Sequence, residues 1–243
     1  MMRRFLFVIL LGAGACAPRV IATPPQAGAD ATPPRDLHWV RTAAEYRALF
    51  IQTYRYATDR LYQEAAARPA GGWAVILDGD ETVLDNSEYQ RRLFQRGERF
   101  DIDTWNAWVR EAAADSLPGA AAFIRSAREL GGRVIMVTNR EEVVCDATRD
   151  NLRRLGMHFD AVLCQQPGER GKNGRLQAVP AGTTSAGLPP LAVIMYIGDN
   201  IQDFPDATQD LRTAPPAQLD RIGRSWFILP NPMYGSWERN PPR

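Results

Sequence analysis

Lysine is almost absent from this chain. Lys172 is the only lysine among 243 residues, and every other strongly basic side chain is an arginine. Basic and acidic residues number 29 and 28, so the net charge is +1 and no basic patch stands out. The near-zero net charge and the lack of a basic patch argue against nucleic-acid binding and favour a small substrate. Because arginine is used everywhere else, the retained Lys172 indicates a position where lysine itself is needed.

Long hydrophobic runs are also missing, apart from a short one at the N-terminus. Residues 5–11 are apolar but too few to span a bilayer, and they follow Arg3 and Arg4. A small-residue region then ends in Cys16, as in a bacterial lipobox. We therefore predict a signal peptide over residues 1–16, with Cys16 lipidated and the lipid as the only membrane contact. Ordinary secretion is the alternative.

This leader predicts a location in the cell envelope. We expect an outer membrane lipoprotein that faces the periplasm or the surface, and otherwise a periplasmic or secreted protein. Residues 17–35 are rich in proline and alanine and predict a flexible tether. Residues 36–243 are long enough to bury a full core and are expected to form one domain.

Cysteine is scarce as well, since only Cys145 and Cys164 remain after Cys16. An oxidising compartment would allow them to pair, and two buried free thiols are the alternative. Cys145 lies early in the predicted helix after the second strand, and Cys164 at the end of the third. Both therefore belong to the same sheet edge, and a disulfide is possible if their Cα atoms lie within about 7 Å.

Five short apolar runs predict the strands of a sheet. They are near-continuous rather than alternating, which is typical of parallel strands covered on both faces. Helical patterns over 117–130 and 141–155 separate the first three, and another covers 36–67. The fold class is therefore α/β, a doubly wound parallel sheet with an N-terminal helix. The predicted strands are residues 73–77, 133–137, 161–163, 192–197 and 226–229.

Two insertions interrupt this alternation. Residues 88–116 follow the first strand, carry Phe100, Trp105 and Trp108, and predict a small helical cover over the site. At their helical spacing the two tryptophans are expected in the core rather than on a ligand. Residues 167–190 are rich in glycine, proline and small polar residues, so we expect a mobile loop around Lys172.

Two acidic segments follow predicted strands directly. Asp78 and Asp80 come after the first strand, and Asp199 and Asp203 come after the fourth. Open α/β sheets bind ligands at the carboxyl ends of their strands, so these carboxylates can converge. Oxygen ligands of this kind suit Mg²⁺, which keeps several waters and needs few carboxylates.

Phosphoryl transfer explains this set of side chains. Asp78 suits the nucleophile that forms an aspartyl-phosphate, and Asp80 the general acid and then base. Crowded carboxylates cannot all ionise easily, so one proton is shared among them. Thr138, which ends the second predicted strand, offers a hydroxyl to phosphate, and Lys172 a compact positive charge.

These motifs together resemble the haloacid dehalogenase superfamily, and more narrowly the bacterial class C acid phosphatases, which are often outer-membrane lipoproteins with 5'-nucleotidase activity. The resemblance rests on residues 78–87, 105–109, 117–120, 138–140, 172–175, 198–204 and 229–238. It implies a magnesium-dependent acid phosphomonoesterase acting on nucleoside 5'-monophosphates and other small phosphomonoesters.

The resemblance also implies residue roles. Asp78 would be the nucleophile and Asp80 the acid and base, with Thr138, Asn139 and Lys172 on the phosphate. The metal site would comprise Asp78, Asp80 through its backbone carbonyl, Asp199 and Asp203. Gly79 departs from the family, which usually has a larger apolar residue there, so we expect a looser catalytic loop.

The C-terminal run 229–238 predicts the substrate contact. It should return across the edge of the site, where Tyr234 and Trp237 could stack a nucleobase. Tyr234 is the preferred platform, because Trp237 could equally pack the C-terminus onto the core.

Three other functions remain open from the sequence, and the oligomeric state is open too. Cys164-x5-Arg170 has the spacing of a cysteine-dependent phosphatase loop, although Pro167 lacks an N–H that such a loop needs. A surface lipoprotein could use the fold only for binding. A phosphotransferase would use the same residues as the hydrolase.

Overall fold

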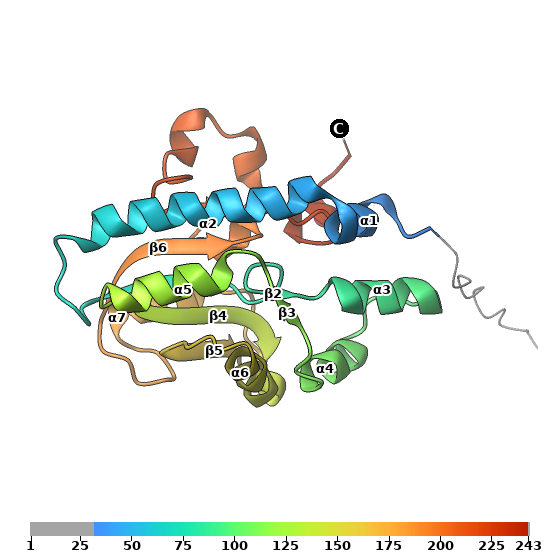
Figure 1. The fold of residues 1–243 in the computed structure, drawn as a ribbon, viewed down its shortest axis with the longest axis horizontal. Helices are drawn as coiled ribbons and strands as arrows, with labels where there is room; N and C mark the ends of the chain where they lie inside the picture. Colours follow the sequence, from blue (N-terminus) through green and yellow to red (C-terminus); the bar gives the residue numbers. More distant parts are fainter. Residues whose placement is uncertain (1–31, 243) are drawn as a thin grey trace, which may run out of the picture.

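The computed structural model describes residues 32–242. The predicted signal peptide, Cys16 and most of the predicted tether lie outside these residues. Five parallel strands form one sheet in the order β5-β4-β1-β6-β7 (Figure 1). This architecture confirms the predicted doubly wound α/β sheet. The strands are β1 (Trp73–Leu77), β4 (Arg133–Glu141), β5 (Ala161–Gln165), β6 (Ala192–Gly198) and β7 (Trp226–Ile228).

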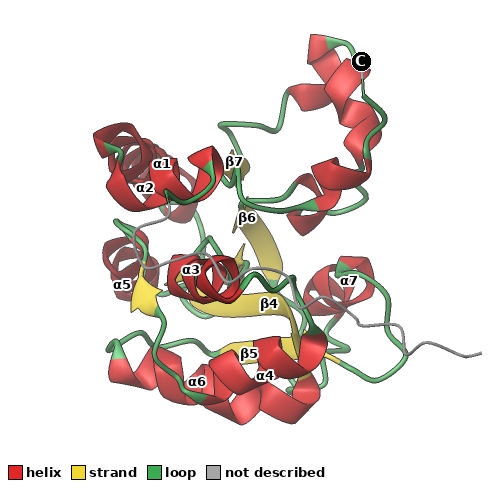
Figure 2. Cartoon of the chain, turned by 90° about the vertical axis from the view of Figure 1, so that its right-hand side faces the viewer, coloured by secondary structure: helices red, strands yellow, loops and turns green. Residues whose placement is uncertain are grey.

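Both faces of the sheet are buried, which is why its strands read as continuous apolar runs. Successive side chains of a strand point to opposite faces. In β1, Val75 and Leu77 pack with the long N-terminal helices, whereas Ala74 and Ile76 pack with Leu176 of the helix before β6. Figure 2 shows the sheet between α2 (Ala44–Ala65) and α5 (Ala120–Glu129) on one side and α7 (Asn173–Ala181) on the other.

The predicted N-terminal helix is two helices. α1 (Arg35–Thr42) ends at Ala43, whose extended backbone lets α2 (Ala44–Ala65) start in a new direction. The apolar repeat of α2 buries one face of this helix on the sheet. The helix predicted over 117–130 starts later, as α5 (Ala120–Glu129), because Gly119 has the left-handed φ of +93°. The buried face of α2 comprises Tyr46, Phe50, Tyr54, Ala57, Leu61 and Ala65.

The insertion after β1 is helical, as predicted. It contains β2 (Leu84–Asp85), α3 (Ser87–Arg96), α4 (Ile102–Arg110) and β3 (Asp115–Ser116). Both of its tryptophans are buried in the main core cluster, which confirms their expected place. In Figure 1, α3 and α4 lie at the end of the sheet where the arrowheads of β4 and β6 point.

We predicted a mobile loop over residues 167–190, and this prediction is wrong for the central part of the segment. Residues Asn173–Ala181 form helix α7, with Lys172 at its N-cap and the left-handed Gly182 at its end. Leu176 and Val179 anchor this helix on the sheet by burial against Ile76 and Val137. Two apolar anchors one turn apart outweighed the glycine-rich and proline-rich composition.

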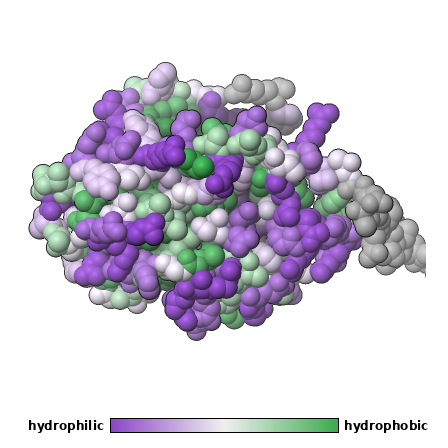
Figure 3. All heavy atoms as spheres, viewed as in Figure 1, coloured by the Kyte–Doolittle hydropathy of each residue, from purple (hydrophilic) through white to green (hydrophobic). Residues whose placement is uncertain are grey.

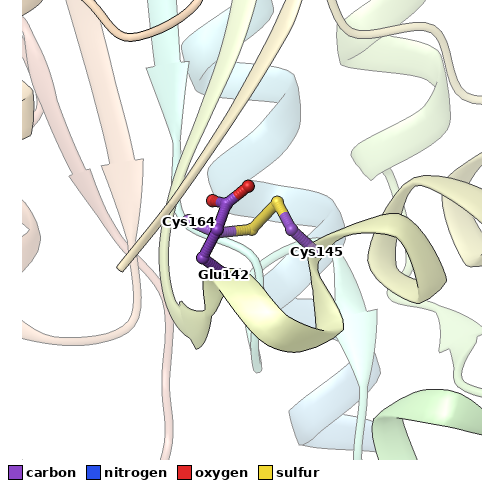
Figure 4. A group of neighbouring side chains, drawn as sticks. All are labelled: Glu142, Cys145 and Cys164. Carbon is purple, nitrogen blue, oxygen red and sulfur yellow. A yellow bond between two sulfur atoms is a disulfide. The ribbon is translucent and has the colours of Figure 1, made fainter. Parts of the chain in front are cut away.

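The helix predicted over 141–155 is shorter and holds one end of a disulfide. A 3-10 turn, η1 (Glu142–Val144), precedes α6 (Cys145–Arg154). Cys145 is bonded to Cys164 of β5, with Cα atoms 6.0 Å apart, so of the two alternatives that the sequence left open the disulfide is the one formed (Figure 4). The bridge ties the segment after β4 to β5, next to Glu142.

The remaining chain after β6 is built from short turns. It comprises η2 (Ile201–Asp203), η3 (Gln209–Thr213), η4 (Pro216–Leu219) and, after β7, η5 (Ser236–Arg239). On the face seen in Figure 3, hydrophilic side chains surround small apolar areas. No helix within residues 32–242 has both the length and the apolar character needed to cross a membrane.

Candidate active site

The predicted acidic residues meet where the direction of strand addition reverses. From β1 the chain adds β4 and β5 on one side, and then returns to add β6 on the other. β1 and β6 are therefore neighbours, and their carboxyl ends lie at the switch point where such sheets bind ligands. The backbone N–H of Asp78 donates to Ile197 O at 2.9 Å, which joins the two acidic loops.

The loop after β1 is tight rather than loose, contrary to the expectation for Gly79. The carbonyl of Gly79 accepts from the N–H groups of Val83 and Leu84 at 3.0 and 2.9 Å. A Cβ atom at Gly79 would lie 3.1 Å from Thr138 Oγ1, so the missing side chain allows close packing. Glu81 takes the left-handed φ of +53°, which an L-residue adopts only at a cost.

The N-terminal helices help to hold this loop. The Tyr54 hydroxyl of α2 donates to the backbone carbonyl of Thr82 at 2.8 Å, and both residues are buried. Thr82 in turn donates from Oγ1 to Asp199 Oδ1 at 3.2 Å. Helix α2 therefore supports the acidic loops through a buried hydrogen bond, although it contributes no catalytic side chain.

Lys172 lies among the carboxylates that the sequence predicted. Its Nζ contacts Asp78 Oδ1 and, at 2.5 Å, Asp203 Oδ1, and all three side chains are buried. Burial lowers the pKa of Lys172, but the charges of Asp203 and Asp78 outweigh this and raise it above its usual range. The lysine is therefore protonated and pairs the two loops across the strand ends.

One lysine does not balance the carboxylates around it. Burial raises the pKa of Asp78, with Lys172 opposing this and Asp203 and Asp199 adding to it. Burial likewise raises the pKa of Asp199 to about 6, and Asp203 adds to the shift. The site therefore holds an excess of negative charge that a further cation would relieve.

The same carboxylates fit a Mg²⁺ ion. Oxygen atoms of Asp78, Asp199 and Asp203 lie within 4.8 Å of one another. Carboxylate oxygens are what this ion prefers, and two or three are sufficient when water completes its shell. The carboxylate of Asp80 is not in this group. It bonds to Arg140 instead, so only its backbone carbonyl could serve the metal.

Thr138 and Asn139 occupy different environments. β4 continues to Glu141, so Thr138 lies within the strand rather than at its end, beside a register irregularity between Val137 and Glu141. Thr138 is buried, and its Oγ1 accepts from Arg140 N at 3.2 Å. Asn139 is exposed and accepts from Arg175 Nη2 at 3.1 Å. Thr138 is therefore close to the acidic loop, whereas Asn139 points to α7.

Arg175 fills the gap that the irregularity leaves between β4 and β5. Its Nη1 donates to Thr138 O and, at 3.0 Å, to Leu163 O, while Nη2 donates to Gly171 O at 2.7 Å. The guanidinium thus supplies donors to carbonyls at the strand ends and to the loop that carries Lys172. Sequence reasoning missed this residue, although its place three residues after Lys172 was part of the family resemblance.

Other polar residues of the site were also missed. Thr82, Glu81 and Asn86 are fully buried in the acidic segment itself, and buried polar groups at a strand end are a usable signal. Arg140 is 1% exposed and reaches Asp80, but no local pattern predicts that contact. Asn231 donates from Nδ2 to Asp199 Oδ2 at 2.8 Å.

The Asn231 contact shows that the C-terminal run returns to the edge of the site, as predicted. Within this run the two aromatic side chains differ. Trp237 is 44% exposed, which argues against its packing the C-terminus onto the core. Tyr234 is half-buried, and its hydroxyl is enclosed without a hydrogen-bond partner. Both side chains therefore belong to a segment that is anchored on an acidic residue of the site.

The disulfide bears directly on one alternative function. A cysteine-dependent phosphatase needs a thiolate at Cys164. In this structure Cys164 is bonded to Cys145 and both are buried, so neither sulfur can act as that nucleophile. The alternative of a cysteine-dependent phosphatase is therefore wrong for the protein with this disulfide formed.

Comparisons with known proteins agree with this geometry. The sequence matches the family described as HAD superfamily, subfamily IIIB (Acid phosphatase), over residues 17–237. The fold is similar to the class C acid phosphatase from Bacillus anthracis solved with tungstate bound. The two share 32% identity and a TM-score of 0.75, over 84% of this chain and 85% of that one.

Plant proteins are more distant relatives. Acid phosphatase 1 of Solanum lycopersicum is 24% identical over 189 residues, covering 74% of this chain and 69% of its own length. The stem 28 kDa glycoprotein of Glycine max is 22% identical over 200 residues, covering 82% of this chain and 71% of its own.

Proposed function

The chain belongs to subfamily IIIB of the HAD superfamily, the acid phosphatases, and on this premise we propose that it hydrolyses small phosphomonoesters through a magnesium-dependent aspartyl-phosphate mechanism. One observation carries the proposal. The carboxylate of Asp78, at the end of β1, contacts Lys172 and gathers with Asp199 and Asp203. Tungstate is a tetrahedral oxyanion like phosphate, so its presence in the Bacillus protein supports an oxyanion ligand for this fold.

In the first step, a carboxylate oxygen of Asp78 attacks phosphorus. A bond forms between that oxygen and phosphorus, and the bond from phosphorus to the alcohol oxygen breaks. Asp80 gives its proton to the departing oxygen. Lys172, whose ammonium already lies against Asp78, offsets charge on the phosphoryl oxygens.

In the second step, water attacks the phosphorus of the aspartyl-phosphate. Asp80 takes a proton from the water, the new phosphorus–oxygen bond forms, and the bond to Asp78 breaks. Phosphate leaves and both aspartates return to their starting states. Thr138 lies next to Gly79, and in this proposal its hydroxyl donates to a phosphoryl oxygen.

Asp78, Asp199, Asp203 and the backbone carbonyl of Asp80 would hold the metal. When bound, Mg²⁺ supplies positive charge that offsets the repulsion between a carboxylate and an anionic ester. The excess of carboxylates over Lys172 supports this assignment.

The predicted leader and the Cys145–Cys164 disulfide support a location in the oxidising cell envelope. The disulfide persists there, whereas the cytosol would reduce it.

The test of this function is turnover of p-nitrophenyl phosphate by the purified protein in Mg²⁺. We expect p-nitrophenol and inorganic phosphate in equal amounts. An excess of p-nitrophenol when an alcohol such as glycerol is added would instead indicate a phosphotransferase. No release of p-nitrophenol would overturn the proposal and leave a binding function.

Turnover should peak on the acid side of neutrality. Asp199 must be ionised to hold the metal, and burial raises its pKa to about 6, so at limiting Mg²⁺ turnover should fall below about pH 6. Protons and metal compete for this carboxylate, so more Mg²⁺ should move the fall to lower pH. Above neutrality turnover should decline, as the family's description as acid phosphatases leads us to expect. A profile that still rises through pH 8 contradicts this prediction.

Nucleoside 5'-monophosphates are the proposed substrates. The C-terminal run reaches Asp199 through Asn231, so Tyr234 and the exposed Trp237 follow within a few residues of the site. A base stacked on an aromatic ring contributes about 1–3 kcal/mol. A ring near the site could therefore bind the base while the 5'-phosphate reaches Asp78.

Replacing Tyr234 by alanine tests the platform. We expect KM for a nucleoside monophosphate to rise by roughly tenfold, which corresponds to loss of one stacking contact, with p-nitrophenyl phosphate turnover nearly unchanged. Trp237→Ala is the matched variant, because this ring is the more exposed of the two. Equal losses on both substrates would mark Tyr234 as a structural residue, and a nucleotide-specific loss only in Trp237→Ala would move the platform there.

A further inference from the structure

The carboxylate of Asp80 is held by one oxygen only. Its Oδ1 accepts from Arg140 Nε at 2.9 Å and from Asn86 Nδ2 at 3.0 Å, and Arg140 Nη2 lies 2.8 Å from the same atom. Among the hydrogen bonds of residues 32–242, none reaches Oδ2. The side chain is 17% exposed. Two hydrogen bonds and one ion-pair contact therefore hold one oxygen, whereas the other has no hydrogen bond within the described residues.

Arg140 is itself held rigidly. Its guanidinium lies over the ring of Trp105, 5.6 Å from the ring centroid, and Nη1 donates to Thr148 Oγ1 at 3.3 Å. Burying a guanidinium is costly, and such a group is kept where its paired donors are used. Its only carboxylate partner within the described part of the chain is Asp80. The orientation of Asp80 is therefore the clearest use of this buried charge.

Asn86 is the second holding group and is fully buried. Its Oδ1 accepts from Trp108 Nε1 at 2.9 Å and from Arg140 Nη2 at 3.2 Å. Because both of those partners are donors, the amide oxygen must face them, and Nδ2 must face Asp80. Trp108 lies in α4, so the insertion after β1 fixes which end of the amide meets the carboxylate.

We propose that Arg140 and Asn86 are positioning residues that turn Asp80 so that the proton it donates is carried on Oδ2. This inference rests on the proposed acid role of Asp80. An acid must lie within hydrogen-bond reach of the oxygen it protonates, and the last torsion of an aspartate is broad when nothing restrains it. With Oδ1 accepting from Arg140 Nε and Asn86 Nδ2, the Oδ2–H bond is the one that breaks as the alcohol O–H bond forms.

The inference also gives the helical insertion a role in the chemistry. Trp105 and Trp108 lie one turn apart in α4 and contact the two positioning residues separately. The insertion therefore supports the general acid as well as covering the end of the sheet.

The loss of kcat/KM on substrates with different leaving groups shows whether a variant disturbs the position of Asp80 or the structure as a whole. A poor leaving group such as an alkyl alcohol needs its proton, whereas 2,4-dinitrophenolate departs without one. For Arg140→Gln and Asn86→Ala, we expect kcat/KM to fall by roughly 100-fold or more for an alkyl phosphate but only a few-fold for 2,4-dinitrophenyl phosphate. Trp108→Phe, which removes one donor to Asn86 and keeps an aromatic ring, should show the same pattern with a smaller loss.

Two reference variants complete the experiment. Asp80→Asn should show the full leaving-group dependence, and if it loses both substrates equally the acid role itself fails. Asn106→Ala is the matched control, because Asn106 is a buried asparagine of α4 that donates to Glu141 rather than to Asp80. Its losses should be uniform across substrates.

The inference is overturned if Asp80→Asn depends on the leaving group while Asn86→Ala and Arg140→Gln lose both substrates evenly. Melting temperatures identify variants that do not fold. If Arg140→Gln does not fold, the conservative variant Trp108→Phe tests the inference instead, through the ratio of its losses in kcat/KM for the two substrates.

Discussion

Replacing Asp78 by asparagine should lower kcat/KM for p-nitrophenyl phosphate by at least about 10,000-fold. The amide has nearly the same size as the carboxylate but cannot attack phosphorus. The side chain is buried against Lys172, which keeps its second partner Asp203 in the variant. The variant should therefore fold. When the reaction is stopped in acid, the wild-type protein should carry covalently bound phosphate from the substrate, and Asp78→Asn should carry none.

An aspartate far from the metal group provides the control for this variant. Asp115 of β3 is exposed and outside the carboxylate group, so Asp115→Asn should keep turnover within about twofold of wild type. The melting temperature of Asp78→Asn should stay close to that of the control. If Asp78→Asn kept even a tenth of wild-type turnover, Asp78 could not be the nucleophile.

The fold could be predicted because its strands are buried on both faces. Continuous apolar runs such as Trp73–Leu77 follow from that burial, and β1 has the predicted bounds. The ends of other elements depend on contacts that the sequence does not display. β4 continues past Val137 because the guanidinium of Arg175 supplies donors at the register irregularity. The helix break at Ala43 has no glycine or proline to signal it.

The positions of Asp78 and Lys172 could be predicted because their spacing along the chain reflects the sheet. Strand ends bring the acidic loops together, and one lysine in an arginine-rich chain is conspicuous. The predicted structure of the segment around Lys172 was wrong, since Lys172 lies at the start of a helix rather than in a mobile loop. Local composition there favours a loop, but Leu176 and Val179 bury themselves on the sheet and decide the outcome.

Partners that are distant in sequence were beyond sequence reasoning. Arg140 lies 60 residues from Asp80 and Asn231 lies 32 from Asp199. Each pair forms only when the sheet and the C-terminal run are in place. Charge and amide side chains are common on protein surfaces, so nothing distinguishes these two before their burial is known. The place of Asp80 in the acidic loop could thus be predicted, but the distant side chain that holds its carboxylate could not.

Removal of the metal should have an effect as large as the loss of a catalytic residue. With excess chelator we expect turnover to fall by at least about 1,000-fold and to return on addition of Mg²⁺, because three carboxylates then face one lysine. Binding should be visible without turnover. A ligand that binds only the folded protein raises its melting temperature, so Mg²⁺ should stabilise the wild type.

Asp199→Asn tests whether the carboxylate group is the site of that binding. The amide keeps an oxygen ligand and can still contact Asn231 and Thr82, but it removes one negative charge from the group. The Mg²⁺ concentration at half-maximal turnover should rise by tenfold or more, since carboxylates are the preferred ligands of this ion. The Mg²⁺-dependent rise in melting temperature should shrink in parallel. Turnover that resists chelation, or an equal thermal shift in Asp199→Asn and wild type, would remove the metal from these three aspartates.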